Sequence, residues 1–165
     1  MTDDGGWELL PQIMTVISSL LAAGSGLLEF GSGVGTARLV KHYRVWSVED
    51  DPEWVGRFGS TYIHAPIVGG WYDLEVLGRE LPPVGDYGLV LVDGPALHRG
   101  ERWRIADHLE LLDERALFLV DDVNFAGGRR TADALAESLG RACRMYGPYA
   151  HSSRHWQIAR RFAVI

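Results

Sequence analysis

Apolar positions along the chain follow a helical spacing in several segments. Ile13, Val16, Ile17, Leu20 and Leu21 fall on one helical face and predict an opening helix that ends near Gly24. Further helices are predicted by four sets of positions: Ala37 and Val40; Trp54, Val55 and Phe58 after a start at Asp51-Pro52; Ile105, Leu109 and Leu112; and Ala132, Leu135, Ala136 and Leu139. A short helix is also predicted from Trp71 to Leu81, closed by two prolines.

Short apolar runs lie between these helical segments and predict strands. The runs at 87–93 and 116–122 are continuous and apolar, which is typical of parallel strands buried on both faces. Other strands are predicted at 27–30, 45–49, 61–67, 143–147 and 156–165, and two arginines in the last run indicate that it has an exposed face. Strands that alternate with helices predict an open, mostly parallel α/β sheet.

Length and composition are those of one packed domain. The 165 residues are 47% hydrophobic and 23% charged, which favours a core over disorder. We therefore expect one domain over 1–165, with residues 1–24 as an N-terminal helix region. Cys143 is the only cysteine, so neither a disulfide framework nor a cysteine zinc site is expected.

The N-terminal residues and the first apolar run bear on where in the cell the protein is located. The first seven residues are acidic, unlike a secretory signal, and the apolar run 9–28 is broken by proline, serines and glycines. No membrane span is therefore expected, and we predict a cytoplasmic protein.

Charge is spread unevenly along the chain. Residues 1–98 hold 13 acids and 5 bases, whereas residues 99–165 hold 9 acids and 11 arginines. The simpler interpretation is a general preference for arginine over lysine, and the alternative is a C-terminal rim that binds an anionic substrate. Because acids interleave the arginines, no nucleic-acid partner is expected.

Acidic residues follow the predicted strands. Glu29, Glu49, Asp93, Asp121 and Asp122 all lie near strand ends. Ligands of open α/β sheets bind at the carboxyl ends of the strands, so these acids are expected at one rim of the molecule.

A glycine-rich loop follows the first predicted strand in the stretch LLEFGSGVGTARLV (27–40). Gly31, Gly33 and Gly35 permit a tight turn and a close approach by a ligand. A nicotinamide cofactor is one candidate, but its fingerprint is G-x-G-x-x-G. Here the third glycine comes one place early, and Thr36 occupies the position of the expected glycine.

The E-x-G-x-G-x-G pattern resembles motif I of the class I S-adenosylmethionine-dependent methyltransferases. Glu49, in the stretch SVEDDPEW, matches the acid that closes the second strand in that family. The resemblance covers essentially the whole chain. It implies a Rossmann-like three-layer α/β sandwich, with a mostly parallel seven-stranded sheet whose last strand is antiparallel, and S-adenosylmethionine as methyl donor. The motif style is nearest to small O-methyltransferases, which implies a small-molecule or sugar hydroxyl as acceptor.

The resemblance also assigns candidate cofactor-binding residues. Glu49 is expected to accept hydrogen bonds from both ribose hydroxyls. Glu29 is expected to order the loop and reach toward the amino-acid part of the cofactor, or alternatively only to brace the loop. The stretch HAPI after the third strand departs from the family, because Ala65 offers only backbone groups to the adenine. The full predicted set is Glu29, Phe30, Gly31, Ser32, Gly33, Thr36, Glu49, Asp50, Ala65 and Asp93.

Catalytic candidates follow the fourth strand. Asp93 matches the position of motif IV, near the transferred methyl, and His98 is a candidate general base or else a surface histidine. Arg99 and Arg102 are expected either to hold an anionic acceptor or to be solvated.

Asp93, Asp121 and Asp122 together resemble the acidic metal site of catechol-type and macrolide-sugar O-methyltransferases. The resemblance implies Mg²⁺ or another divalent cation, which prefers hard oxygen ligands and lowers the pKa of a hydroxyl. The alternative is that Asp121 and Asp122 cap the next helix.

Two rival functions stay open at this stage: a nicotinamide-dependent oxidoreductase, and a cofactor-binding subunit without independent activity. A homodimer is a further hypothesis. His151, Arg154 and His155 are expected to line the acceptor side.

Overall fold

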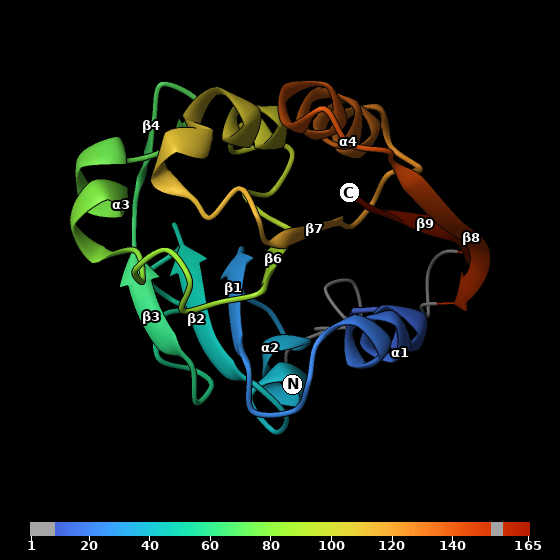
Figure 1. Ribbon diagram of the computed structural model, residues 1–165, viewed down its shortest axis with the longest axis horizontal. Coiled ribbons are helices and arrows are strands. Elements are labelled where there is room, and N and C mark those ends of the chain that lie inside the picture. Colours follow the sequence, from blue (N-terminus) through green and yellow to red (C-terminus); the bar gives the residue numbers. More distant parts are fainter. Residues whose placement is uncertain (1–8, 153–156) are drawn as a thin grey trace.

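A twisted seven-stranded sheet forms the centre of the protein in the computed structural model, which describes residues 9–152 and 157–165 (Figure 1). Its order is β3-β2-β1-β6-β7-β9-β8. The five strands from β3 to β7 are parallel, β9 is antiparallel to β7, and β8 pairs antiparallel with β9. These strands are β1 (Gly26–Phe30), β2 (Arg44–Glu49), β3 (Thr61–His64), β6 (Leu89–Val92), β7 (Leu117–Val120), β8 (Arg144–Ser152) and β9 (Gln157–Val164). The fold class expected from the sequence is confirmed.

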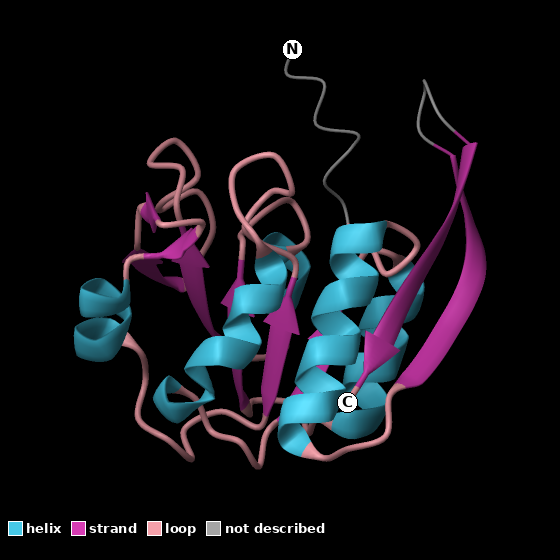
Figure 2. Ribbon diagram, turned by 90° about the horizontal axis from the view of Figure 1, so that it is seen from above, coloured by secondary structure: helices cyan, strands magenta, loops and turns pink. Residues whose placement is uncertain are grey.

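Helices cover both faces of this sheet (Figures 1 and 2). Ile13 and Ile17 of α1 and Leu39 of α2 pack in one core, and Leu77 of α3 and Leu135 of α4 pack in the other. The two cores make three layers, as a sheet buried on both faces requires. The helices are α1 (Pro11–Leu20), α2 (Thr36–Leu39), α3 (Leu74–Glu80), the 3-10 segment η1 (Arg102–Leu111) and α4 (Ala126–Leu139).

The helix predicted after Asp51-Pro52 does not form, so that prediction is wrong. Residues 51–60 form successive turns, with Gly56 at φ +81°. The Asp51 side chain accepts from the Glu53 amide, and the Arg57 side chain donates to the Glu53 carbonyl. Two glycines within four positions remove helix propensity, so local hydrogen bonds hold the turns instead.

Several other predicted boundaries shift. Residues 71 and 72 form the short strand β5 (Trp71–Tyr72), paired with β4 (Ile67–Val68), and helix α3 begins only after Asp73, whose carboxylate caps it. The third strand ends at His64 rather than at 67, α2 is only four residues long, and β8 is nine residues long.

Backbone hydrogen bonds continue the ladder just past the strand ends. The Gly31 amide donates to the Val48 carbonyl, the Asp93 amide to Phe30, and the Asp121 amide to Val92. These bonds hold the loops after β1, β2, β6 and β7 side by side at one edge of the sheet. The described residues contain no helix long and apolar enough to cross a membrane.

Candidate active site

The loops after β1 and β6 pass each other with their backbones in contact. Gly31 has φ +84°, and a Cβ built on it would lie 2.6 Å from the Cα of Gly94. A Cβ on Gly94 would lie 2.5 Å from both the Gly31 Cα and the Tyr72 hydroxyl oxygen. Only glycine fits at either position, so the first glycine of the loop serves both the turn and this crossing.

Glu29 braces the glycine loop from beneath. Its side chain is 1% exposed, and Oε1 accepts from the Thr36 hydroxyl at 2.7 Å and the Ser47 hydroxyl at 2.5 Å. The Thr36 oxygen in turn accepts from the Gly33 amide at 3.1 Å. Burial raises the pKa of Glu29 to about 7, and the two hydroxyl hydrogen bonds oppose the rise.

Glu49 ends β2 and joins the glycine loop to the loop that follows β2. Its Oε2 accepts from the Ser32 amide at 2.8 Å and the Ser32 hydroxyl at 2.9 Å, and its Oε1 accepts from the Asp51 amide at 2.9 Å. The carboxylate is nearly buried but lines the neighbouring groove. Oε2 therefore already accepts two hydrogen bonds, whereas Oε1 accepts one and retains an acceptor site for a further donor.

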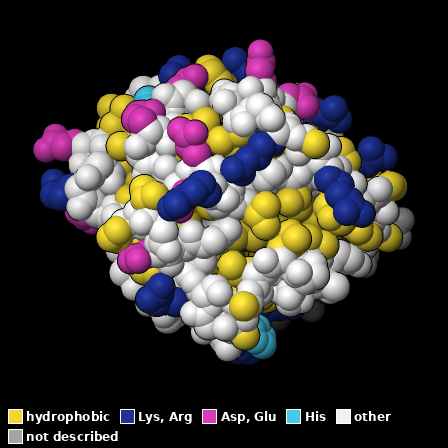
Figure 3. All heavy atoms as spheres, viewed as in Figure 1, with side chains coloured by type: hydrophobic (Ala, Val, Ile, Leu, Met, Phe, Trp, Pro, Cys, Tyr) yellow, Lys and Arg dark blue, Asp and Glu magenta, His cyan; other side chains and the backbone are white. Residues whose placement is uncertain are grey.

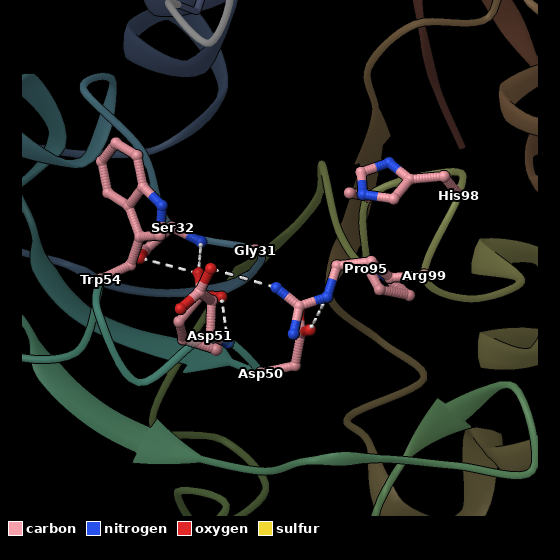
Figure 4. A pocket seen from close by; sticks show the side chains of 10 residues that line it. Gly31, Ser32, Asp50, Asp51, Trp54, Pro95, His98 and Arg99 are labelled. Carbon is pink, nitrogen blue, oxygen red and sulfur yellow. Dashed lines mark hydrogen bonds and ion pairs between the residues drawn. The ribbon is translucent and has the colours of Figure 1, made fainter. Parts of the chain in front are cut away.

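A groove of about 190 Å³ lies between the loops that follow β1, β2 and β6 (Figure 4). It brings together parts of the chain that are more than sixty residues apart. Its walls are Gly31, Ser32, Glu49, Asp50, Asp51, Trp54, Pro95, Ala96, His98 and Arg99.

Trp54 forms the aromatic wall of this groove. The Arg57 guanidinium carbon lies 4.3 Å from the centre of the indole, and Phe58 packs at 6.3 Å. The cation–π contact and the ring contact hold the indole in place. An aromatic wall of this kind suits a planar group such as a nucleobase.

Arg99 spans the groove to the acids after β2. Its Nε lies 2.7 Å from Asp50 Oδ2, and its Nη1 donates to Asp51 Oδ2 at 3.1 Å (Figure 4). Burial raises the pKa of Asp50, and the Arg99 guanidinium opposes this rise. The ion pairs therefore favour the charged form of a nearly buried carboxylate, against the effect of burial.

The three acids after β6 and β7 gather around two arginines. Arg102, with a 1% exposed side chain, places Nη1 3.6 Å from both Asp93 Oδ1 and Asp122 Oδ2, and its Nε donates to the Pro95 carbonyl at 2.9 Å. Arg160 of β9 contacts Asp121 Oδ2 at 2.5 Å and Asp122 Oδ1 at 3.3 Å. Asp122 itself has φ +60°, which turns its side chain toward both arginines.

Burial and the proximity of like charges raise the pKa values of two aspartates in this cluster. Burial, and then the neighbouring Asp121 carboxylate, raise the pKa of Asp93 well above its usual range. Burial raises the pKa of Asp121 to about 6, with Asp122 adding to the rise and Arg160 opposing it. Two arginines face three acids, and the raised pKa values of Asp93 and Asp121 reflect this excess of acids together with burial.

These contacts give no support for the metal site expected at Asp93, Asp121 and Asp122. The acids do come together, but guanidinium groups occupy the positions that a cation needs. Within the described ranges, no group of three or more His, Cys, Asp or Glu side chains is arranged to hold a metal ion.

The predicted site residues fall into three places. Gly31, Ser32, Glu49, Asp50 and His98 line the groove, and His98 is exposed there. Asp93 lies outside the groove walls, in the arginine-bound cluster. The others are Gly33, which lies within the glycine loop, and four buried residues in the core or under that loop: Glu29, Phe30, Thr36 and Ala65.

Two of these buried residues have clear structural partners. Phe30 packs against Trp71 and Tyr72 at 5.5 and 5.6 Å, and the Ala65 amide donates to the Glu49 carbonyl at 2.9 Å. Arg154 and His155, and the side chain of His151, lie outside the described residues.

Sequence reasoning missed the second wall of the groove and the arginine partners of the acids. Trp54 was expected on the apolar face of a helix, and Arg102 was expected near solvent or an acceptor. Two arginines in the last strand carried a signal, because only one of them can face outward; Arg160 is nearly buried and Arg161 is exposed.

No family model and no curated protein matches the sequence. Solved structures do match. A protein from Thermoplasma acidophilum described as a methyltransferase is 13% identical, with a TM-score of 0.55 over 95% of this chain and 74% of that one. This protein has the fold of the class I S-adenosylmethionine-dependent methyltransferases. Spermidine synthase from Thermotoga maritima is 11% identical, with a TM-score of 0.54 over 88% of this chain and 54% of that one.

A third similar structure comes from another archaeal protein. A protein from Pyrococcus horikoshii described as an RNA methyltransferase is 15% identical, with a TM-score of 0.54 over 93% of this chain and 77% of that one. At sequence identities this low, the structural similarity establishes the shared fold alone. The reaction and the acceptor therefore have to be argued from the residues of the site.

Proposed function

We propose that this protein transfers a methyl group from S-adenosylmethionine to an oxygen of a small-molecule or sugar acceptor. The observation that carries the proposal is Glu49, a carboxylate at the end of β2 that faces a groove beside the glycine loop. The residues present fit the cofactor: Gly31 lines the groove without a side chain, Glu49 can accept a hydroxyl donor, and Trp54 offers an aromatic wall.

The cofactor supplies an already activated methyl group, so the chain has to bind, orient and move a proton. Glu49 would bind one ribose hydroxyl with the open acceptor site on Oε1, and a second ribose hydroxyl would replace the Ser32 hydroxyl at Oε2. Burial raises the pKa of Asp93, and its side chain is 25% exposed beside Arg102, so Asp93 is the first candidate base for a hydroxyl proton. His98 at the groove is the second candidate base.

A small acceptor is favoured over a nucleic acid by the distribution of charge. On the face shown in Figure 3, Lys and Arg side chains are scattered among acidic and apolar ones and form no continuous stripe. Nucleic-acid binding typically needs a basic stripe. The homodimer stays a prediction, and a mass measurement in solution tests it.

The nicotinamide alternative is disfavoured by the sheet. Dinucleotide-binding folds have the strand order 3-2-1-4-5-6, built from two parallel halves. Here the second half of the sheet ends in the antiparallel hairpin β8–β9. Thr36 stands where the dinucleotide fingerprint has its third glycine, and its buried hydroxyl donates to Glu29.

Calorimetric titration with S-adenosylhomocysteine tests the proposal. Glu49→Gln keeps the shape but removes the charge, and we expect about a 10- to 100-fold loss of affinity, because charge-assisted hydrogen bonds are lost. Glu53→Gln makes the same charge change on an exposed turn and should leave affinity unchanged. Binding of NADH but not of S-adenosylhomocysteine would overturn the proposal.

A further inference from the structure

Arg99 joins two walls of the groove that no strand pairing joins directly. It belongs to the loop after β6, whereas its partners Asp50 and Asp51 follow β2, and β1 lies between these strands. The guanidinium itself lines the groove (Figure 4). A ligand that lies along the groove must therefore pass beneath this side chain or displace it.

The backbone that carries Arg99 is firmly held. The Arg99 amide donates to the Ala96 carbonyl at 2.7 Å, and the Glu101 amide donates to the Gly70 carbonyl at 2.7 Å. A Cβ on Gly100 would lie 2.7 Å from Pro95 Cγ, so the turn is closely packed. Any opening of the bridge is therefore a rotation of the Arg99 side chain and not a movement of the loop.

The two ion pairs of Arg99 differ in solvent exposure. The buried pair favours the closed bridge, and the exposed pair allows it to open. The side chain of Asp50 is 5% exposed, whereas those of Asp51 and Arg99 are 31% and 37% exposed. Releasing Arg99 leaves the Asp50 carboxylate nearly buried without a counter-charge, so closure is favoured. The Asp51 contact is open to solvent and is weakened by salt.

We propose that Arg99 is a positioning residue that closes the groove over the nucleoside end of the bound cofactor and opens to admit it. This inference rests on the proposed function. A closed bridge slows both entry and escape of the ligand, because both need the same side-chain rotation. It holds the nucleoside against Trp54 during the transfer.

Stopped-flow tryptophan fluorescence with S-adenosylhomocysteine measures both rates. This probe carries no net charge, so electrostatic steering of its encounter with the protein is small. We expect Arg99→Gln to raise the association and dissociation rate constants by about three- to tenfold each, as loss of two partly exposed ion pairs permits. The dissociation constant should change less than either rate.

Two further measurements separate a gate from a general structural role. In the unmodified protein the association rate should rise with salt, whereas in Arg99→Gln it should be independent of salt. Asp51→Asn removes only the exposed contact, leaves Asp50 paired, and should give an intermediate acceleration. Arg79→Gln removes an equal charge from α3, outside the groove, and should change neither rate.

The outcomes separate this inference from the proposed function. Binding with equal rates in the unmodified protein, Arg99→Gln and Asp51→Asn overturns the gate and leaves the proposed function standing. Absence of binding to all of these proteins overturns the proposed function, and the gate with it. Binding detectable only in the variants supports the gate in its strongest form.

Discussion

Two groups of acids at the same edge of the sheet are stabilised in different ways. Glu29 and Glu49 accept hydrogen bonds from hydroxyls and amides of the glycine loop and its helix, of β2 and of the loop after β2, all from residues within 18 positions. Asp93, Asp121 and Asp122 instead face the guanidinium groups of Arg102 and Arg160. The first group holds a loop and retains acceptor capacity for a ligand. The second is a nearly complete internal ion network.

The two groups of acids therefore have different roles. The first can bind a ligand, and the second supports the structure around the groove. A carboxylate bonded to neutral donors can accept another hydroxyl, whereas one opposite a guanidinium already has its counter-charge. Arg102 also fixes the Pro95 carbonyl and so the loop that carries His98 and Arg99. The aspartate cluster therefore shapes one wall of the groove from behind.

Removing an arginine from the cluster should have the largest effect on stability. Arg102→Met leaves Asp93 without its ion-pair partner and Asp122 with Arg160 alone, and we expect a loss of about 3–5 kcal/mol in the free energy of unfolding. Urea unfolding measures it. Arg104→Met, an exposed change in the same segment, should cost under about 1 kcal/mol.

A second substitution tests the cause of that loss. If uncompensated charge is responsible, Asp93→Asn in the Arg102→Met background should restore part of the lost stability. An additive further loss would show that Arg102 acts by packing alone, and the comparison between the two acid groups would then fail.

Glu29 should make a smaller, pH-dependent difference. Its folded pKa of about 7 exceeds the ordinary value of 4.5, so between these pH values the folded chain holds a proton that the unfolded chain releases. Stability contributed by protonated Glu29 is therefore present at low pH and lost as pH rises to about 7, with a total of roughly 3 kcal/mol.

Thermal unfolding from pH 4.5 to 7.5 checks this prediction. Glu29→Gln can still accept from Thr36 and Ser47, and it should show a shallower decline in melting temperature than the unmodified protein. The decline should not vanish, because Asp93 and Asp121 also have raised pKa values. Equal slopes in the two proteins would contradict the assigned role of Glu29.

The sequence predicted the parts that depend on local pattern. Continuous apolar runs identified β6 and β7, and the glycine spacing with Glu49 identified the loop and the acid at the groove. Parallel topology then placed the acids at one edge, as the structure confirms.

Pairings across long sequence distances could not be predicted. Arg160 meets Asp121 from 39 positions away, and Arg99 meets Asp51 from 48 positions away. The sequence alone does not distinguish an aspartate that pairs with an arginine from an aspartate that binds a metal ion. Trp54 was misplaced for a related reason: its apolar spacing fits a helix, but the glycines that follow let turns prevail.

The smallest expected effect is that of magnesium, and it bears directly on the second acid group. Because Arg102 and Arg160 supply the counter-charge, Mg²⁺ would have to displace a guanidinium. Millimolar MgCl₂ should therefore shift the melting temperature of the unmodified protein by no more than about 1 °C relative to NaCl of equal ionic strength. Arg160→Met is the matched positive control, because it exposes Asp121 and Asp122 to an incoming cation; there the same salt should raise the melting temperature. A concentration-dependent rise in the unmodified protein would show that the carboxylates, despite their arginines, still form a metal site, and would restore the catechol-type mechanism for this fold.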